Sequence, residues 1–177
     1  MSVSPAYRIE PMTLADVDEV ADLEQVCFSA PWPRSAFQSD LRNSYARYVV
    51  LRAEGSPTIL GYAGLWLLVD EAHITTIAVR PGHRRRGLGE LLLFHLFELA
   101  AEFDIRTLTL EVRAGNRAAQ DLYYKYGFHQ EGLRRRYYTD TGEDALFMRS
   151  GDIAAPETQA LLQQRRQALW GRLTRAK

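Results

Sequence analysis

Three groups of residues in this 177-residue sequence have the types and spacing of a chemical site. The first is the loop Arg84–Gly89, which follows the apolar stretch Ile77–Val79 and precedes a Leu-rich segment. The first turn of a helix carries main-chain N–H groups without partners and the positive end of the helix dipole. Glycines 87 and 89 would let a ligand approach that turn closely. The spacing predicts a pyrophosphate site, although a solvated basic loop would look much the same.

The glycine spacing also excludes two other phosphate motifs. A Walker loop needs a Gly-Lys-Ser/Thr ending, and a dinucleotide fingerprint needs three glycines. Neither pattern occurs in this loop, whose charge comes from three consecutive arginines.

The second group is a carboxylate within an apolar strand. Glu111 lies between Leu110 and Val112, so its side chain should point to the opposite face of the strand. A carboxylate beside a ligand cleft could accept a proton directly or through water. An ordinary surface ion pair with Arg113 or Arg106 is the competing interpretation of the pattern.

The third group is a tyrosine on a helix that Asn116 should cap. Tyr123 shares its helix face with other residues that should pack towards a sheet, Ala119, Leu122 and Tyr126. An unperturbed tyrosine has a pKa of about 10, so at neutral pH it holds a proton that it can donate. Tyr124 should point away from this face. A core tyrosine without a chemical role is the ordinary alternative.

The composition is that of one globular domain. Hydrophobic residues make up 46% of the chain, and 22 Lys and Arg balance 22 Asp and Glu. Bulk charge therefore gives no reason to expect nucleic-acid binding. The sequence shows neither a secretory signal pattern nor an apolar run of about 18 residues, so we expect a cytoplasmic protein without a membrane segment.

Cysteine and histidine usage argues against covalent and metal chemistry. A single cysteine, Cys27, excludes an intramolecular disulfide and a Cys-rich metal site. Its position in a predicted helix favours a buried apolar side chain over a nucleophile. The four histidines are scattered without the spacing of metal ligands, so we expect no metal.

Alternating strands and helices must position these groups. Hydrophobic periodicity and turn residues predict strands over residues 7–10, 46–53, 58–69, 71–79, 107–112, 128–132 and 145–149. Helices are predicted over residues 14–28, 34–41, 87–103, 116–127 and 159–173. This order predicts an α/β fold with a mixed sheet and helices on its faces. Residues 1–154 should form the domain, and residues 155–177 a basic C-terminal helical extension.

Together these motifs resemble the GCN5-related N-acetyltransferase (GNAT) family. The resemblance covers about residues 7–150 and is carried by Arg84-x-x-Gly87-x-Gly89, Leu110–Asn116 and Leu122-Tyr123-x-x-Tyr126-Gly127-Phe128. Within the family the sequence most resembles the bacterial RimI type, which acetylates the N-terminal alanine of a small-subunit ribosomal protein. That similarity is carried by Phe28-x-x-Pro31-Trp32, Arg135-Arg136-Tyr137-Tyr138 and Glu143-Asp144-Ala145.

The resemblance implies a mostly antiparallel sheet and acetyl-coenzyme A as the acetyl donor. It implies that one set of residues holds this cofactor: Ile77, Ala78, Val79, Arg84, Arg85, Arg86, Gly87, Leu88, Gly89 and Asn116. Glu111 would be the proton acceptor and Tyr123 the proton donor. The acceptor substrate would contact Glu24, Trp32, Tyr137 and Tyr138. The last four residues also have ordinary structural interpretations, as the polar edge of a helix, a core cover and strand residues.

The acceptor implied by the resemblance is the α-amine of a protein N-terminus. Roughly a tenth of an α-amine is neutral at pH 7, against well under a thousandth of a lysine side chain. A single modest base therefore suits an N-terminus better. An acetyltransferase for lysine side chains or small amines, and a catalytically silent coenzyme A-binding module in ribosome assembly, are the alternatives. The oligomeric state stays open.

Overall fold

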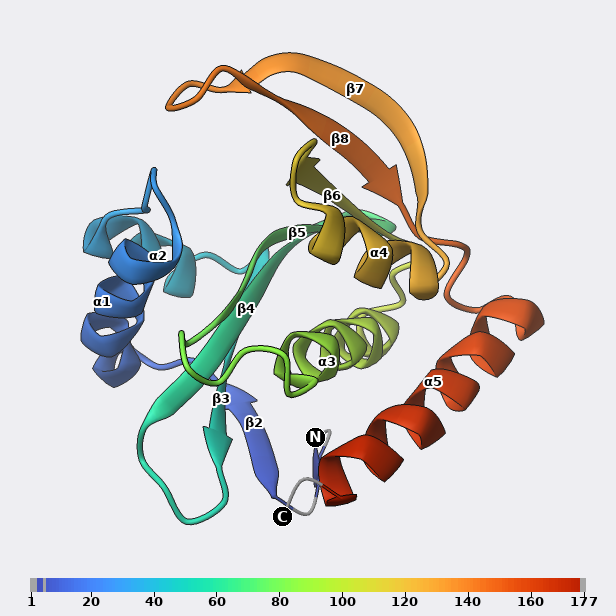
Figure 1. The fold of residues 1–177 in the computed structure, drawn as a ribbon, viewed down its shortest axis with the longest axis horizontal. Coiled ribbons are helices and arrows are strands. Elements are labelled where there is room, and N and C mark those ends of the chain that lie inside the picture. The colour runs from blue at the N-terminus through green and yellow to red at the C-terminus, as the bar shows by residue number, and fades with distance from the viewer. Residues whose placement is uncertain (1–2, 5, 176–177) are drawn as a thin grey trace.

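The computed structural model describes residues 3–4 and 6–175 (Figure 1). Its described residues form one eight-stranded sheet in the order β1-β2-β3-β4-β5-β6-β8-β7. The strands are β1 (Val3–Ser4), β2 (Tyr7–Pro11), β3 (Ala46–Ala53), β4 (Ile59–Leu68), β5 (Glu71–Val79), β6 (Thr107–Arg113), β7 (His129–Tyr138) and β8 (Glu143–Arg149). Only β5 and β6 are parallel neighbours, and the other pairs are antiparallel. The predicted mixed, mostly antiparallel sheet is confirmed.

Helices cover both faces of this sheet. They are α1 (Val17–Cys27), which follows a short 3-10 turn, α2 (Arg34–Leu41), α3 (Leu88–Glu102), α4 (Arg117–Lys125) and α5 (Pro156–Arg175). Helices α1 and α2 lie on one side of β3 to β5, while α3 and α5 lie on the other (Figure 1). The predicted placement of helices on both faces is therefore confirmed.

Strand β3 shows why the sheet needs two helical layers. Tyr48 and Val50 belong to the core under α1 and α2, whereas Val49 and Leu51 belong to the core under α3. Successive side chains of a strand point to opposite faces, so an apolar run of this kind must be covered on both sides. A fully buried Val or Leu side chain contributes about 1.5–3 kcal/mol relative to an exposed one.

Strands β5 and β6 open the sheet at its centre. They pair only from Glu71 to His73, against Thr107 to Thr109. Beyond Thr109, β6 continues beside β8 as far as Arg113. The second half of β5 therefore has no strand partner on its β6 side, and its main-chain groups face a cleft between the two strands.

Strand β7 extends further than the pattern predicted. It continues to Tyr138, whereas the sequence indicated an end at Gly132. Its register against β8 shifts twice, and Arg136 has a φ of 48° in the left-handed region. The run of exposed charged side chains carries no alternation, which is why the second half of this strand was not predicted.

The C-terminal helix α5 packs against the domain. Leu162, Leu169 and Leu173 are buried in the same core as α3. The division of the chain at residue 154 stays a prediction, because a shared core does not show which part folds by itself. No helix among the described residues is both long and apolar enough to cross a membrane.

Candidate active site

A cavity of about 430 Å³ lies where β5 and β6 diverge. Helices α1 and α4 and the end of β7 complete its walls. The residues that line it are Glu24, Cys27, Phe28, Ser29, Ala30, Trp32, Ile74, Thr75, Thr76, Ile77, Leu110, Glu111, Val112, Arg113, Asn116, Ala119, Tyr123 and Tyr138. The cavity therefore brings the predicted base, the predicted acid and part of both predicted binding sets together from segments far apart in sequence.

Glu111 is held by a histidine and an arginine from two other strands of the sheet. Nε2 of His73 on β5 lies 2.7 Å from Glu111 Oε2, and Nη2 of Arg134 on β7 lies 3.5 Å from Oε1. The ordinary alternative, a pair with Arg113 or Arg106, is wrong, because those arginines pair with Asp140 and Asp152, which lie nearer to them.

These contacts determine the charge of Glu111. Burial raises the pKa of this carboxyl, but the hydrogen bond and charge of His73 and the charge of Arg134 outweigh burial and leave the pKa below its ordinary value. Glu111 is therefore a carboxylate at neutral pH. The ring of His73 is in turn fixed by a 2.9 Å hydrogen bond between its Nδ1 and Thr109 Oγ1.

Tyr123 faces the same cavity from α4. Its ring packs against Phe128 with 5.6 Å between the ring centroids. Burial raises its pKa to about 12, with a smaller contribution from Tyr138. Tyr123 therefore keeps its proton through the neutral range. Tyr124 is 47% exposed, as the helix pattern predicted, and buried Tyr126 donates a 2.8 Å hydrogen bond to Glu90.

The phosphate loop has the geometry expected of an anion site. Gly87 is the N-cap of α3 with a φ of 83°, a conformation that favours glycine. Because glycine has no side chain to cap the helix, the main-chain N–H groups of the first turn remain available to a ligand. Arg85 and Arg86 are exposed, whereas the side chain of Leu88 is buried, so Leu88 can offer only its main chain.

The loop adjoins the cavity at Cys27. Nη2 of Arg84 lies 3.5 Å from Cys27 Sγ, and its Nε donates a 3.1 Å hydrogen bond to the carbonyl of Val79. Ala78 packs its side chain into the core under α1, so it too can offer only its main chain. The free edge of β5 suits an extended pantetheine arm. The N-terminus of α3 and the side chain of Arg84 suit the negative charge of the pyrophosphate at its end.

Asn116 and Cys27 both line the cavity. Asn116 is the N-cap of α4, accepting a 3.2 Å hydrogen bond from the Ala119 N–H, and it also lines the cavity, so it can both cap the helix and meet a ligand. Cys27, which was predicted to be a buried apolar side chain, packs against the core under α1 but is not fully buried. It is half-buried and lines the cavity, because it is the last residue of α1, where the helix meets β5.

The acceptor side of the cavity contains a buried carboxylate. Glu24 is only 4% exposed, so it is not merely the polar edge of α1. It accepts a hydrogen bond from the hydroxyl of Tyr62 and another, of 3.1 Å, from the main chain of Trp32. Burial raises the pKa of Glu24 more than these hydrogen bonds lower it. The indole of Trp32 stacks on Trp66, with 6.2 Å between centroids.

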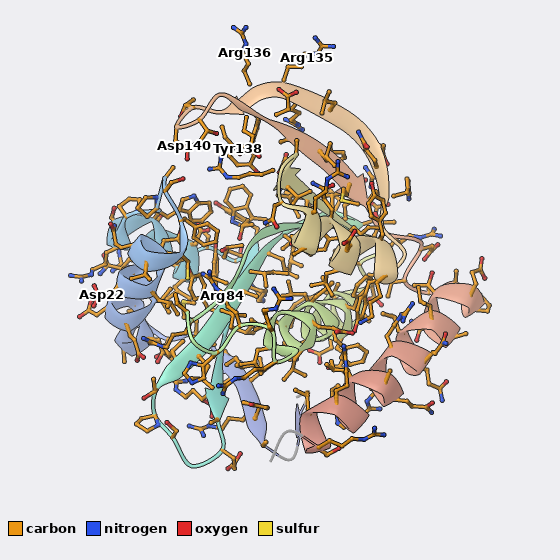
Figure 2. All side chains as sticks on the ribbon, in the orientation of Figure 1. Asp22, Arg84, Arg135, Arg136, Tyr138 and Asp140 are labelled. Atoms are coloured by element: carbon orange, nitrogen blue, oxygen red, sulfur yellow. The ribbon has the colours of Figure 1, made fainter. Side chains whose placement is uncertain are left out.

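Of the two β7 tyrosines predicted to contact the substrate, only one faces the cavity. Tyr138 lines the cavity, and the Arg113 guanidinium lies 3.9 Å from its ring centroid. Tyr137 is 44% exposed and does not line the cavity, because neighbouring strand residues point to opposite faces. Arg135 and Arg136 point away from the domain into solvent, whereas Tyr138 lies under the hairpin (Figure 2).

Comparison with known proteins decides the family. The model of the acetyltransferase (GNAT) family matches residues 17–128. The chain belongs to the GNAT acetyltransferase family. It is 44% identical over 141 residues to the putative ribosomal protein bS18-alanine N-acetyltransferase of Bacillus subtilis, covering 79% of this chain and 92% of the relative. It is 41% identical over 152 residues to the N-alpha-acetyltransferase RimI of Mycobacterium tuberculosis, covering 81% and 93%.

A solved GNAT structure agrees with the fold. The ribosomal-protein-S18-alanine N-acetyltransferase from Escherichia coli superimposes with a TM-score of 0.77 at 34% identity, covering 85% of this chain and 97% of that one. The predicted family and the expected acetyl-transfer activity are therefore confirmed. GNAT acetyltransferases use acetyl-coenzyme A as their acetyl donor.

Several site residues could not be identified from the sequence. His73, Arg134 and Tyr62 orient the two carboxylates, yet each is separated from its partner by more than 20 positions. The sequence contains no local spacing that would join them.

Within the described residues no group of three or more His, Cys, Asp and Glu could hold a metal ion.

Proposed function

We propose that this GNAT enzyme acetylates the N-terminal α-amine of a protein, namely the N-terminal alanine of ribosomal protein bS18. The observation that carries the proposal is the single cavity that joins Glu111 and Tyr123 with the buried carboxylate Glu24. The names of the relatives supply the acceptor. Because ribosomal proteins are made in the cytoplasm, the enzyme would act there.

Acetyl-coenzyme A, when bound, supplies an activated thioester. Its pyrophosphate would lie at Arg84–Gly89, where the first turn of α3 offers main-chain N–H groups. The main chain of residues 77–79 would hold the pantetheine arm, with Asn116 on the opposite wall of the cleft. This placement directs the thioester towards the space between Glu111 and Tyr123.

Glu111 would accept the proton that the attacking amine must lose. Its pKa lies below the ordinary value, so full transfer from a free α-ammonium, of pKa about 8, is unfavourable by several kcal/mol. The nitrogen becomes a far stronger acid as its bond to the acetyl carbon forms. Glu111 therefore has most effect during that step, receiving the proton directly or through a water molecule.

Tyr123 would donate a proton to the departing sulfur. Its pKa of about 12 keeps it protonated at neutral pH, so its hydroxyl can hydrogen-bond to the developing thiolate. Because a thiol is ordinarily the stronger acid, full transfer from Tyr123 is uphill and is completed as solvent returns the proton. The acetyl group moves from sulfur to nitrogen in one transfer, without an acyl-enzyme.

The test is acetylation of a peptide that begins with the bS18 N-terminal sequence and contains an internal lysine. We expect one acetyl group on the α-amine, located by tandem mass spectrometry. The matched control is the same peptide with a blocked N-terminus, on which turnover should fall to background. Acetylation of the lysine in the blocked peptide would instead support the lysine alternative, and no turnover on either peptide with coenzyme A bound would support a silent module.

A second experiment tests the acceptor in cells. Mass spectrometry of ribosomal-protein N-termini, from cells with and without this protein, should show loss of acetylation on bS18 in its absence. Unchanged bS18 with loss of acetylation on another protein would contradict the proposed acceptor and leave the N-terminal activity in place.

A further inference from the structure

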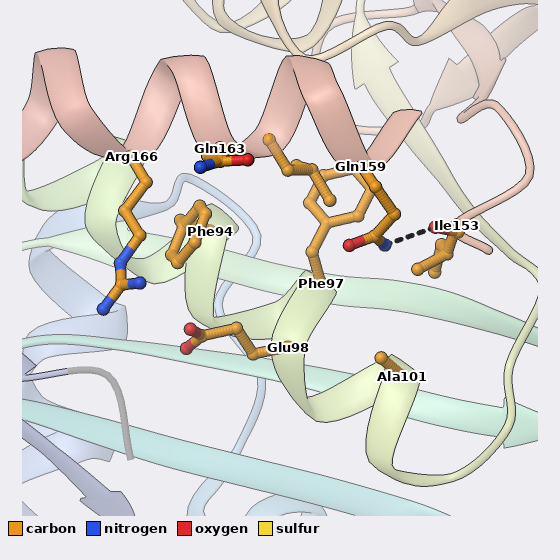
Figure 3. A pocket seen from close by; sticks show the side chains of 9 residues that line it. Phe94, Phe97, Glu98, Ala101, Ile153, Gln159, Gln163 and Arg166 are labelled. Atoms are coloured by element: carbon orange, nitrogen blue, oxygen red, sulfur yellow. Dashed lines mark hydrogen bonds between the residues drawn. The ribbon is translucent and has the colours of Figure 1, made fainter. Parts of the chain in front are cut away.

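The last turns of α5 pack against the phosphate loop at Gly87. Helix α5 runs along α3 (Figure 3), and Trp170 packs edge-on against Phe94 with 5.6 Å between ring centroids. A groove of about 330 Å³ lies between the two helices further along, near the start of α5. At the other end, Leu169 and Leu173 reach the loop itself. The helix is therefore tightly packed where α3 begins.

Gly87 shows how close this contact is. A Cβ atom on Gly87 would lie 3.2 Å from Leu169 Cδ1 and 3.5 Å from Leu173 Cδ2. Both leucines are buried. The two side chains therefore pack against the backbone turn that joins the phosphate loop to α3.

A charged contact at the same place involves Glu90, in the first turn of α3. Glu90 is only 6% exposed, and Arg172 of α5 donates a hydrogen bond to its Oε2. The carboxylate also accepts from Lys125 Nζ at 3.1 Å and from the Tyr126 hydroxyl at 2.8 Å. Burial raises the pKa of Glu90, but these hydrogen bonds outweigh it and leave the pKa below its ordinary value.

This arrangement matters because Glu90 carries a negative charge beside an anion site. An acidic residue in the first turn can turn back to the helix N-terminus and compete for its N–H groups. Here Arg172, Lys125 and Tyr126 hold both carboxylate oxygens towards α4 and α5. A ligand pyrophosphate then meets an N-terminus whose adjacent carboxylate is already neutralised.

We propose that Arg172 is a positioning residue for the cofactor: it holds and neutralises Glu90 so that the N-terminus of α3 can bind the pyrophosphate of coenzyme A. Leu169 and Leu173 support the same turn. The proposal rests on the proposed cofactor site. Helix α5 would then contribute to the affinity for coenzyme A as well as to the packing of the core.

The test measures the binding of coenzyme A by calorimetry. Arg172→Ala should raise the Kd by about threefold to fivefold, the size typical of a charge near a helix N-terminus. Arg172→Lys should bind nearly as wild type. The increase should shrink at high salt, because Arg172 is 53% exposed at its side chain and its charge is screened.

A double variant separates charge from support of the fold. Adding Glu90→Gln to Arg172→Ala removes the unneutralised carboxylate and should restore the Kd to within about twofold of wild type. If Arg172 acted only by attaching α5, removing its partner would give no recovery. Arg165→Ala is the matched control, because Arg165 attaches α5 to the main-chain carbonyl of Lys125 at 3.1 Å without touching Glu90.

The outcomes distinguish this proposal from the proposed function. A wild-type protein that does not bind coenzyme A would overturn both. Wild-type binding with an unchanged Kd in Arg172→Ala, or a loss in the single variant that Glu90→Gln fails to restore, would overturn the role of Arg172 alone. Thermal melting identifies any variant that does not fold, and Arg172→Gln then provides the same test with a side chain of similar length.

Discussion

At the scale of single residues, the proposed chemistry depends on partners that fix each titratable group. Glu111 is charged because His73 and Arg134 face it, whereas the buried Glu24 has a raised pKa. Two carboxylates at one cavity are thus given different basicities by their surroundings.

Replacing Glu111 by Gln should lower kcat about a hundredfold or more, the size typical of a positioned base. The amide keeps the size of the side chain but cannot accept the proton. The Kd for coenzyme A should stay nearly unchanged. Steady-state kinetics and calorimetry provide the measurement, with Glu131→Gln on exposed β7 as the control. A wild-type kcat in the Glu111 variant would contradict its role as base.

Replacing Tyr123 by Phe should lower kcat to a similar extent at neutral pH, since only the donor hydroxyl is lost. A proton donor acts below its pKa, and burial raises that of Tyr123 to about 12. The wild-type rate should therefore show no loss from this residue below about pH 10. Tyr124→Phe, on the exposed face of the same helix, should leave kcat unchanged. Equal rates in the two variants would be evidence against Tyr123.

Replacing His73 by Leu should shift the acidic limb of the kcat profile to higher pH. A base is active above its pKa, and His73 lowers the pKa of Glu111 against the effect of burial. Without the imidazole, the largest of the contributions that lower the pKa is lost and the pKa rises, so activity is lost at a higher pH as the solution is acidified. The pH profile is the measurement. An unchanged acidic limb would show that the titration of Glu111 does not control the rate at low pH.

At the scale of elements, the two glycines at the start of α3, Gly87 and Gly89, have different tasks. Gly87 needs its positive φ and lies against Leu169, so a side chain there strains the fold. A Cβ on Gly89 would meet only Val79 Cγ2 at 3.8 Å, an ordinary contact. The second glycine is therefore free to serve the ligand.

Replacing Gly89 by Val should weaken coenzyme A binding by at least tenfold while the protein stays folded, because the branched side chain blocks close approach to the first turn. Gly87→Ala should instead lower the melting temperature, since Ala disfavours a φ of 83°. Calorimetry and thermal melting separate the two effects. Undiminished affinity in folded Gly89→Val would rule out the pyrophosphate site.

At the scale of the whole molecule, the core under α3 continues into α5. Leu162, Leu169 and Leu173 are buried with the α3 side chains, and Phe94 meets Trp170 across the two helices. The spacing of these leucines is equally compatible with packing on their own domain and with packing on a second copy of the chain. The structure shows them packed on their own domain.

Replacing Leu169 by Ala should destabilise the protein by about 2–5 kcal/mol, the usual cost of a cavity in a core. Leu169 is 0% exposed. Denaturant unfolding measures the change, and exposed Gln164→Ala on the same helix should change stability by less than about 0.5 kcal/mol. A similarly small effect at Leu169 would mean that α5 contributes little to the core.

The sequence by itself determined the features that depend on neighbouring residues. The start of α3 at Gly87, the cap at Asn116 and the strand that presents Glu111 all follow from local spacing and main-chain chemistry. The order of strands and helices likewise predicted a sheet with helices on its faces. Such features involve residues only a few positions apart, so a single sequence contains them.

Only the tertiary structure decided which distant side chains meet. His73 and Glu111 come together because β5 and β6 pair for three residues before they separate, and the same separation opens the cavity. Tyr137 leaves the cavity and Cys27 enters it through the register of β7 and the end point of α1. Arg172 reaches Glu90 across 82 positions. Contacts of this kind depend on how whole elements pack, and local periodicity carries no information about that packing.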